Sequence, residues 1–587
     1  MQQLHAHNSM SMAQRPSELT DRLLELWGWG LLSTPQLQLL AEGAQLDGLS
    51  SEQINSLASV GSRGAHPGNM RRDLMRSVLG DLPAVFKPAM VAVPYVKKKS
   101  GTVDFMQLPV MLPSDVLRAL YTDYRTVFME MLGQGPKWFW DHVNNEDPRL
   151  LGHPMCTELG WENTCLPIVL HIDGAKYTNK DSMLVISWTL LQSSGNTWDT
   201  HFLVAAFPKS CRAVAALHGH DTMHSVWEYI KHDFNAVMSG THAPLQANGL
   251  EWPEGSEQAH YAGTPIAGGY KGVVWNLTAD WDALANELGM PHFNGPQPCW
   301  LCRADRADNN FRDVSAHAAW RNTLWPVLEG NMEAPSTHPA FSIHGLSRFC
   351  VLGDLMHTAD LGTTQNLLGS ALYELLQEGP YHGSLTKRTE QLWAEIQGQY
   401  SLLDTPSRLG SLQVIALKPR PSDWSCLTGV KAADTRHLTP VVLRICQAHN
   451  DGSEHHAHRI AALESMDGIY NLLEEHGFFL PTPAADEALS MYERFALHYN
   501  WLTNAALARG ELAYNMTSKM HLLYHIIHSA RWINPRAVWA YSFEDYIGKI
   551  VLAAHACTAG TPAHKVPEKL LQNWSTVMAM RLQRRLR

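Results

Sequence analysis

Two cysteines, Cys299 and Cys302, form a C-x-x-C motif in the stretch "NGPQPCWLCRAD". Structural zinc usually takes four sulfur or nitrogen ligands, so this motif could supply two of them. The chain has no second C-x-x-C motif. Elsewhere in the chain, His521 and His525 are four residues apart on one face of a predicted helix, a spacing that can chelate a metal. A redox disulfide and ordinary unliganded cysteines stay open, although the preceding "GPQP" is typical of a loop and not of a redox-active helix start.

Three acidic residues could carry a second kind of chemistry. Asp173 and Asp280 each follow an apolar, strand-like run, and ligand sites in open α/β sheets lie beyond the carboxyl ends of strands. If the two strands are parallel neighbours, the two carboxylates converge and need a hard divalent cation such as Mg²⁺ between them. Aspartate is equally common as a turn or helix-capping residue. Glu544, beside the apolar stripe of a late helix, could supply a third carboxylate or simply face solvent.

The elements that would position these acids follow a recognisable order. The sequence predicts three consecutive strands over 166–178, 182–192 and 201–208, with Asp173 at the carboxyl end of the first buried run. A helix over 222–238 and a fourth strand over 271–280 come next. Three meandering strands, a helix and another strand are the opening order of an RNase H-like α/β fold.

The rest of the chain is predicted to be mostly helical. A hairpin with a Lys-Ser-Gly turn precedes one amphipathic helix that begins at Ser114. The region 355–529 has helical spacing almost throughout, with 453–459 as a polar loop, and another amphipathic helix covers 541–560. Residues 1–15 are predicted to be disordered.

The composition restricts the class of protein. A chain of 587 residues is too long for one ordinary core, and its nine cysteines do not indicate a disulfide framework. No apolar stretch is long enough to span a membrane, no secretory signal is visible, and we expect a reducing compartment. The formal charge of -10 counts against a protein that coats nucleic acid in general, but not against a local basic groove.

Four motifs occur in order along the chain: "LHIDG", "TADWDALANELGMPHFNGPQPCWLCRA", "LGDLMHTADLG" and "KMHLLYHIIHSARWINPRAVWAYSFEDYIGKI". Together they resemble the DDE transposases of the CACTA (En/Spm-like) class, over about residues 160–560. The resemblance implies that Asp173, Asp280 and Glu544 hold Mg²⁺ or Mn²⁺ for DNA cleavage and strand transfer, which are phosphoryl transfers. Asp282 and Asp354 are rivals of Asp280 for the second position.

The resemblance also implies a structural zinc ion. It pairs the C-x-x-C motif with the Met-His of "DLMH", which makes His357 the third ligand after Cys299 and Cys302. The fourth ligand stays open among four candidates, which are His521, His525, His528 and Asp354. Such a zinc ion would hold the helical region against the catalytic core.

We therefore expect an RNase H-like α/β core interrupted by a large helical insertion. The predicted segments are a mostly helical region 1–150, the first part of the core 151–354, the insertion 355–529, and a terminal helix with a basic tail 530–587. The resemblance implies transposon ends and target DNA as partners, a possible homo-oligomer, the nucleus as location and no membrane. Two alternatives remain: a domesticated, inactive relative that binds DNA or protein, and an unrelated metalloprotein. The acidic charge and the lack of a visible N-terminal DNA-binding zinc finger favour the first of these.

Overall fold

The computed structural model describes residues 17–49, 51–77, 86–325, 334–418, 420 and 422–586, and every structural statement below concerns these residues. The predicted disorder of residues 1–15 lies outside them. The described chain is a mixed α/β structure that is mostly helical and contains a small mixed sheet. Within it, every helix is too short or too polar to cross a membrane.

A two-stranded hairpin precedes the main sheet. Strands β1 (Ala89–Val96) and β2 (Val103–Val110) pair antiparallel, from Ala89 opposite Val110 to Val96 opposite Val103. The predicted hairpin and its Lys-Ser-Gly turn are therefore confirmed. The turn falls where three lysines, a serine and a glycine interrupt two runs of alternating buried residues.

The main sheet has four strands in the order β5-β4-β3-β6. Their bounds are β3 (Cys165–Thr178), β4 (Asp181–Leu190), β5 (His201–Pro208) and β6 (Lys271–Thr278). All four predicted strands are present, and the first and fourth of them, β3 and β6, are neighbours. β4 and β5 pair antiparallel, with a register shift between Ile186 and Ser187.

The position of Asp173 differs from the prediction. Cys165 to Ile172 are all buried, as expected for an apolar run covered on both faces, but the strand continues to Thr178, and of its last six residues only Tyr177 is buried. Asp173 therefore lies inside β3, where its burial decreases, and not at its carboxyl end. The glycine that follows Asp173 does not end the strand, because its backbone stays extended and paired.

The described chain forms two compact units, each assembled from separate stretches. Unit 1 is Met1–Gly133, Ile172–Gly272 and Phe543–Arg587, and unit 2 is Gln134–His171 and Val273–Ser542. The helices of unit 1 are α1 (Glu18–Gly28), α2 (Thr34–Leu46), α3 (Glu52–Arg63), α4 (Met70–Ser77), α5 (Pro113–Thr122), α6 (Arg125–Met131), α8 (Thr197–Thr200), α9 (Ala215–His218), α10 (Thr222–Ser239), α11 (Glu257–Tyr261), most of α20 (Tyr541–Ala556) and α21 (Val566–Arg585). The single helix predicted from Ser114 is two helices, because the backbone leaves helical geometry at Tyr124.

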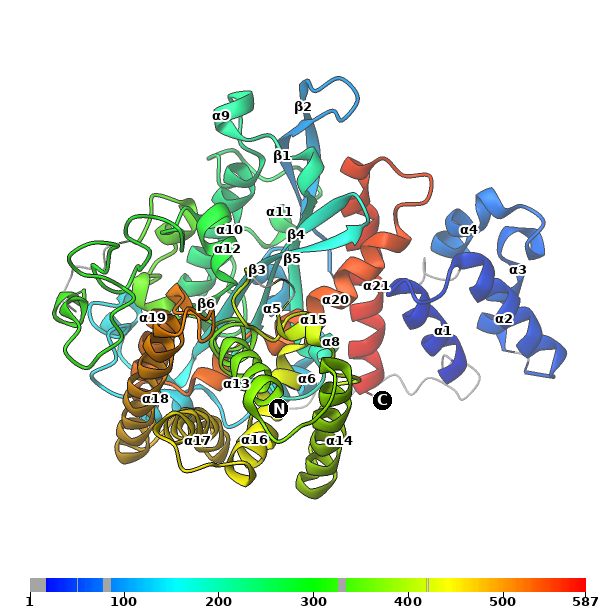
Figure 1. Cartoon of the computed structure of the whole chain (residues 1–587). Coiled ribbons are helices and arrows are strands. Elements are labelled where there is room, and N and C mark those ends of the chain that lie inside the picture. The colour runs from blue at the N-terminus through cyan, green and yellow to red at the C-terminus, as the bar shows by residue number, and fades with distance from the viewer. Residues whose placement is uncertain are drawn as a thin grey trace. The chain divides into compact units, whose positions relative to one another are not determined.

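Unit 2 carries most of the remaining helices (Figure 1). They are α7 (Pro136–His142), α12 (Trp281–Leu288), a π-helix (Met356–Thr363), α13 (Thr364–Glu378), α14 (Leu385–Leu403), α15 (Val414–Leu417), α16 (Ala432–Ala448), α17 (Glu454–Glu475), α18 (Thr482–Ala508) and α19 (Ser518–His528). The predicted polar loop over 453–459 is instead the start of α17. Ser453 caps that helix by accepting a hydrogen bond from the His456 amide, so the polar stretch is a helix N-terminus.

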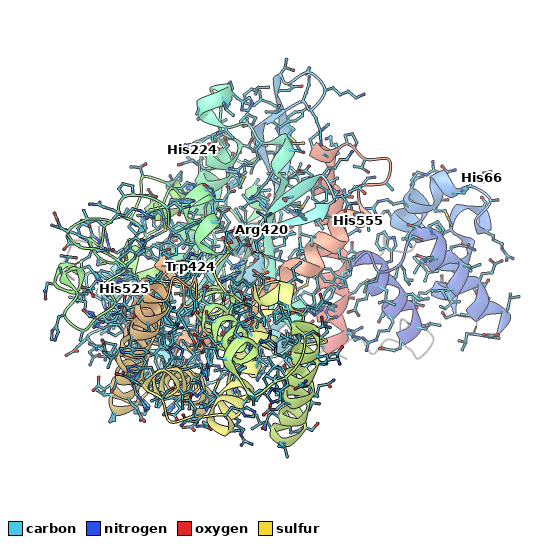
Figure 2. All side chains as sticks on the ribbon, in the orientation of Figure 1. His66, His224, Arg420, Trp424, His525 and His555 are labelled. Carbon is cyan, nitrogen blue, oxygen red and sulfur yellow. The ribbon has the colours of Figure 1, made fainter. Side chains whose placement is uncertain are left out.

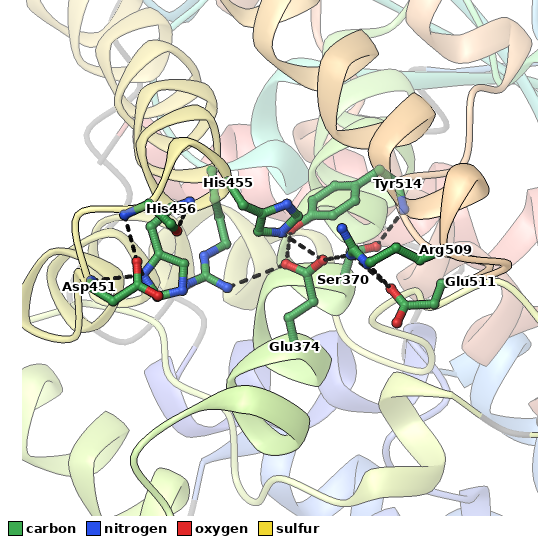
Figure 3. Close-up of polar contacts among 10 residues, drawn as sticks. Ser370, Glu374, Asp451, His455, His456, Arg509, Glu511 and Tyr514 are labelled. Carbon is green, nitrogen blue, oxygen red and sulfur yellow. Dashed lines mark hydrogen bonds and ion pairs between the residues drawn. The ribbon is translucent and has the colours of Figure 1, made fainter.

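A buried carboxylate lies among these helices (Figure 3). Glu374 on α13 accepts hydrogen bonds from His455, Arg459, Arg509 and Tyr514, and we call these five residues the Glu374 cluster. Burial opposes ionisation of Glu374, but the contacts with His455 and the charge of Arg459 outweigh it and hold the pKa of Glu374 below its ordinary value. The helical region thus contains a charge that its own side chains neutralise.

Candidate functional site

Four potential metal ligands meet inside unit 2. The potential ligand atoms are the sulfurs of Cys299 and Cys302 and the Nε2 atoms of His521 and His525. All four atoms lie within 4.8 Å of one another. Each of the four side chains is buried. We call these residues the Cys2His2 group; it is the one such group of three or more potential ligands in the described part of the chain.

The distances within the Cys2His2 group match a zinc site. Bond lengths of about 2.3 Å to sulfur and 2.0 Å to nitrogen in a tetrahedron place a sulfur and a nitrogen about 3.5 Å apart. Cys299 Sγ lies 3.5 Å from His525 Nε2, and Cys302 Sγ lies 3.3 Å from His521 Nε2. The two Nε2 atoms are 3.1 Å apart. The chemistry and the spacing of these donors therefore fit one tetrahedral ion.

Local structure explains why the two pairs face each other. In the C-x-x-C turn the Leu301 amide donates a hydrogen bond to Cys299 Sγ at 3.3 Å. His521 and His525 are one helical turn apart on α19, on which Figure 2 labels His525. The Trp320 ring packs edge-on against His521 at 4.2 Å and helps to close the group from solvent.

The protonation of the group suits a cation. Burial raises the pKa of the Cys299 thiol, but the hydrogen bond with Cys302 and the charges of His525 and His521 outweigh it and hold that pKa well below its usual range. The same hydrogen bond, together with burial, raises the pKa of Cys302. Burial also lowers the pKa of His521, which favours the neutral imidazole that binds metals. A divalent ion would remove the remaining thiol proton.

His357, the ligand implied by the family resemblance, lies outside the Cys2His2 group. Its Nδ1 is 2.6 Å from Asp354 Oδ2, and the His357 amide donates to the same oxygen. The other oxygen of Asp354 accepts from the Ala540 amide at 2.8 Å. Burial opposes ionisation of Asp354, but its contacts with His357 hold its pKa below the ordinary value. The structure thus assigns both remaining positions to histidines of α19.

His528 and Asp354 were the other candidates for the fourth ligand. The ring of His528 packs against Tyr524 and Trp532, both at 5.6 Å between ring centroids, and burial lowers its pKa to about 4. Both oxygens of Asp354 are occupied by protein donors. Neither residue therefore belongs to the Cys2His2 group.

The structure places Asp280 as a helix cap. Asp280 follows β6 by two residues, is half-buried, and accepts a hydrogen bond from the Ala283 amide at 2.6 Å at the start of α12. Its rival Asp282 is exposed and accepts from the Asn286 amide group at 2.8 Å. The capping role of Asp280, left open by the sequence, is therefore present, and it occupies one of the two carboxylate oxygens.

The other two acids belong to unit 1. Asp173 is half-buried in β3 and Glu544 is half-buried in the first turn of α20. The predicted apolar stripe of α20 is confirmed, because its members are buried: Phe543, Ile547, Ile550 and Ala554.

Two contacts fix α20 against strands of unit 1. The ring of Phe543 lies 4.7 Å from that of His201, the first residue of β5. His555, near the end of α20 (Figure 2), has its Nδ1 2.9 Å from the Tyr177 carbonyl oxygen of β3. Asp173 and Glu544 are therefore carried by elements that pack against each other.

Comparison of the chain with known protein families finds no family that matches it, and comparison with curated proteins finds no matching relative.

Proposed function

We propose that the chain is a DDE-type, metal-dependent DNA strand transferase related to the CACTA transposases, with a structural zinc ion in the Cys2His2 group. The observation that carries the proposal is the group itself. It joins the C-x-x-C turn, which lies after Asp280 and α12 in the chain, to α19, the helix that precedes the Glu544 helix. Two of the four motifs that carry the family resemblance thus contribute ligands to one group, which supports the proposal.

The strand order gives independent support. An RNase H-like core has three antiparallel strands with a fourth strand beside the first, which corresponds to the order β5-β4-β3-β6. Asp173 lies on the first of these strands and Asp280 closely follows the fourth.

Zinc and magnesium would have different tasks. Thiolate and imidazole ligands in a closed, buried site are typical of structural zinc, which contributes free energy of folding and does not touch substrate. Asp173, Asp280 and Glu544 would hold Mg²⁺ or Mn²⁺, which supplies an activated hydroxide or DNA 3′-OH and stabilises the leaving oxygen.

A strand-transfer assay tests this proposal. Duplexes carrying inverted repeats that flank the gene are incubated with the full-length protein and Mg²⁺ or Mn²⁺, and cleaved and joined products are separated by electrophoresis. Asp173→Asn, Asp280→Asn and Glu544→Gln should each abolish product. Asp282→Asn is the matched control for Asp280, because Asp282 is exposed two positions away. An active Asp173→Asn protein, or an inactive Asp282→Asn protein with active Asp280→Asn, would overturn the assignment.

A second function is favoured by one observation. Because Asp280 caps α12, the residue also has a structural task that does not depend on a metal. A transposase-derived protein that has lost catalysis and binds DNA or a partner protein would keep this cap and the zinc ion. In that case the wild-type protein should bind flanking repeat DNA without cleaving it, and the Asp173→Asn protein should bind this DNA equally well.

A further inference from the structure

A cavity of about 580 Å³ lies entirely within unit 2 and has a lining of mixed chemistry. Its volume falls in the range of about 300–1,000 Å³ that holds small organic ligands and cofactors. The walls come from the start of α12, the C-x-x-C loop, the π-helix and the start of α19. None of the four members of the Cys2His2 group lines it, whereas Asp280, one of the proposed catalytic acids, lies in its wall. The proposed strand-transfer chemistry assigns no task to the rest of this space.

One end of the cavity is suited to a phosphate group. The N-terminus of α19, from Asn515 to Lys519, lines it, and among the described residues no side chain caps this helix. The exposed amides and the dipole of a helix N-terminus favour a bound anion. The hydroxyl of Thr517, at the capping position, is buried and has no hydrogen-bond partner within the described chain. An oxygen-rich anion would satisfy these donors together.

Lys519 adds a positive charge at the same end. Its ammonium group donates to the carbonyl oxygens of His357 at 2.7 Å and Leu361 at 2.9 Å, both in the π-helix, which leaves one N–H for a ligand. Gly362 makes room for this lysine: a Cβ at Gly362 would lie 2.4 Å from Lys519 Cδ. π-helical turns occur often at functional sites, because they expose carbonyl groups that a regular helix would use.

The cavity also has a wall suited to a planar base. Phe293 is half-buried and lines it, and Phe311 carries two guanidinium groups, that of Arg306 at 5.1 Å and that of Arg312 at 5.7 Å from the ring centroid. Arg306 is held in place by donating to the carbonyl oxygens of Gly295 and Phe293. Aromatic rings and guanidinium planes stack on nucleic-acid bases without regard to their sequence.

The lining carries acids as well as cations. Asp354 has both oxygens occupied by protein donors, Asp282 accepts from Asn286, and Asp280 accepts from the Ala283 amide. Lys519 donates to carbonyl oxygens of the π-helix and also interacts with the charges of Asp280 and Asp354, Arg306 donates to carbonyl oxygens, and Arg312 lies over the Phe311 ring. The end of the cavity that favours an anion is therefore the one where the amides of α19 add to the charge of Lys519.

We propose that this cavity binds a nucleotide, with its phosphate at the N-terminus of α19 and Lys519, and its base against Phe293 and the arginines on Phe311. Two sources share this chemistry. One is a free nucleotide; the other is an unpaired nucleotide of a DNA strand, which rests on the proposed function. Enzymes that act on DNA bases commonly flip a nucleotide out of the base stack and into a protein pocket.

Calorimetric titration of the full-length, metal-loaded protein tests the proposal. The ligands are deoxyadenosine 5′-monophosphate, deoxyadenosine, a short single-stranded DNA and a blunt duplex of the same sequence. The monophosphate should bind about tenfold or more tightly than the nucleoside, because the phosphate makes the charge-assisted contacts. Binding of the monophosphate alone identifies a free nucleotide as the source, and binding of the single strand alone identifies an unpaired nucleotide of DNA. Binding of both shows that the cavity accepts a nucleotide from either source. Binding of neither by folded protein overturns the proposal, as does equal affinity for monophosphate and nucleoside.

Two pairs of variants locate the site. Lys519→Met should weaken monophosphate or single-strand binding about tenfold, whereas Lys431→Met, at an exposed lysine of unit 2 outside the cavity, should not. Gly362→Ala should weaken it similarly by displacing Lys519, whereas Gly398→Ala, where a Cβ meets open space on α14, should not. Binding that ignores both Lys519→Met and Gly362→Ala would show that the ligand lies elsewhere.

A third variant separates this proposal from the function. Asp173→Asn lies outside the cavity and should lose strand transfer but keep nucleotide affinity. Nucleotide binding with no strand transfer by wild-type protein would refute the function alone, and the reverse would refute the nucleotide site alone.

Arg312→Ala, at an exposed residue, should weaken binding of nucleoside and monophosphate alike, by about three- to tenfold, since it removes a stacking partner and not a phosphate ligand.

Discussion

Unit 2 contains two buried polar clusters that balance their charges in opposite ways. In the Glu374 cluster one carboxylate is surrounded by donors: His455 at 3.0 Å, Arg459 at 3.3 Å and Tyr514 at 2.5 Å. In the Cys2His2 group four potential metal-binding atoms, two sulfurs and two nitrogens, lie within 4.8 Å of one another. The first cluster is complete as a set of protein groups, whereas the second gains the most from a metal ion.

This difference teaches how to separate a structural charge network from a metal site. A buried carboxylate that accepts from several donors has a lowered pKa and needs nothing further, as Glu374 shows. A buried set of thiols and imidazoles has too few protons to pair all its lone pairs, and a divalent cation replaces those protons. Removing a member should therefore affect metal content in one cluster and only stability in the other.

The largest effect is expected from removing a zinc ligand. Cys299→Ser and His525→Asn should each release zinc and lower the thermal midpoint strongly, because structural zinc contributes on the order of 10 kcal/mol to folding. Cys156→Ser, at an exposed cysteine of unit 2, is the matched control and should keep both metal and midpoint. Metal analysis and differential scanning calorimetry measure the two quantities. Folded wild-type protein that contains no zinc and is indifferent to chelators would contradict the zinc site.

A smaller effect is expected when the Glu374 cluster loses its carboxylate. Glu374→Ala leaves buried cations without a partner and should reduce the free energy of unfolding by roughly 3–5 kcal/mol, with no loss of zinc. Glu390→Ala, at an exposed glutamate on α14, should change it by less than about 0.5 kcal/mol. Urea unfolding at neutral pH gives both values. A Glu374→Ala protein as stable as the wild type would show that the cluster is not a net source of stability.

The pH dependence sharpens the comparison further. The folded-state pKa of Glu374 lies below its ordinary value of 4.5. The ionised carboxylate therefore contributes fully to the free energy of unfolding above pH 4.5, and this contribution is lost as the pH falls through the folded-state pKa. The difference in unfolding free energy between wild type and Glu374→Gln should therefore be constant near neutral pH and shrink below about pH 4.5. A difference that grows on acidification would have the wrong sign for a carboxylate stabilised by donors.

The smallest effect is expected at His357. His357→Gln should cost about 1–3 kcal/mol, because Asp354 loses one of its buried hydrogen-bond partners, but zinc content should stay unchanged. His521→Gln, on α19, should lose zinc under the same conditions. Loss of zinc from His357→Gln with retention in His521→Gln would restore His357 as the ligand.

The strands and their neighbours followed from local patterns. Cys165 to Ile172 and the fourth strand are mostly apolar, as expected for strands that are covered on both faces of a sheet. The end of β3 was not predictable in the same way, because Asp173 and Gly174 are weak strand formers that pairing keeps extended. The start of α17 was missed for a related reason: Ser453 and the histidines after it look like a loop until the cap is seen.

Ligand identity needed the three-dimensional structure. Cys299 and Cys302 were recognisable from spacing alone, whereas His521 and His525 were only two of four candidates for the fourth ligand. His357 was predicted as the third ligand, because its sequence neighbours matched a family motif. In the structure the His357 ring contacts Asp354, three residues earlier. Residue spacing alone does not say whether a histidine will contact a nearby carboxylate or a zinc ion.

The π-helix Met356–Thr363 depends on the number of residues in this segment as well as on their side chains. A π-turn accommodates one residue more than an α-helix over the same rise, and such a bulge is removed by deleting a single residue. That deletion would rotate everything before the bulge by about 100° relative to α13, since an α-helix has 3.6 residues per turn. Asp354 and His357 would then leave the cavity wall with every side chain intact, so a one-residue deletion could disable this region more thoroughly than most substitutions.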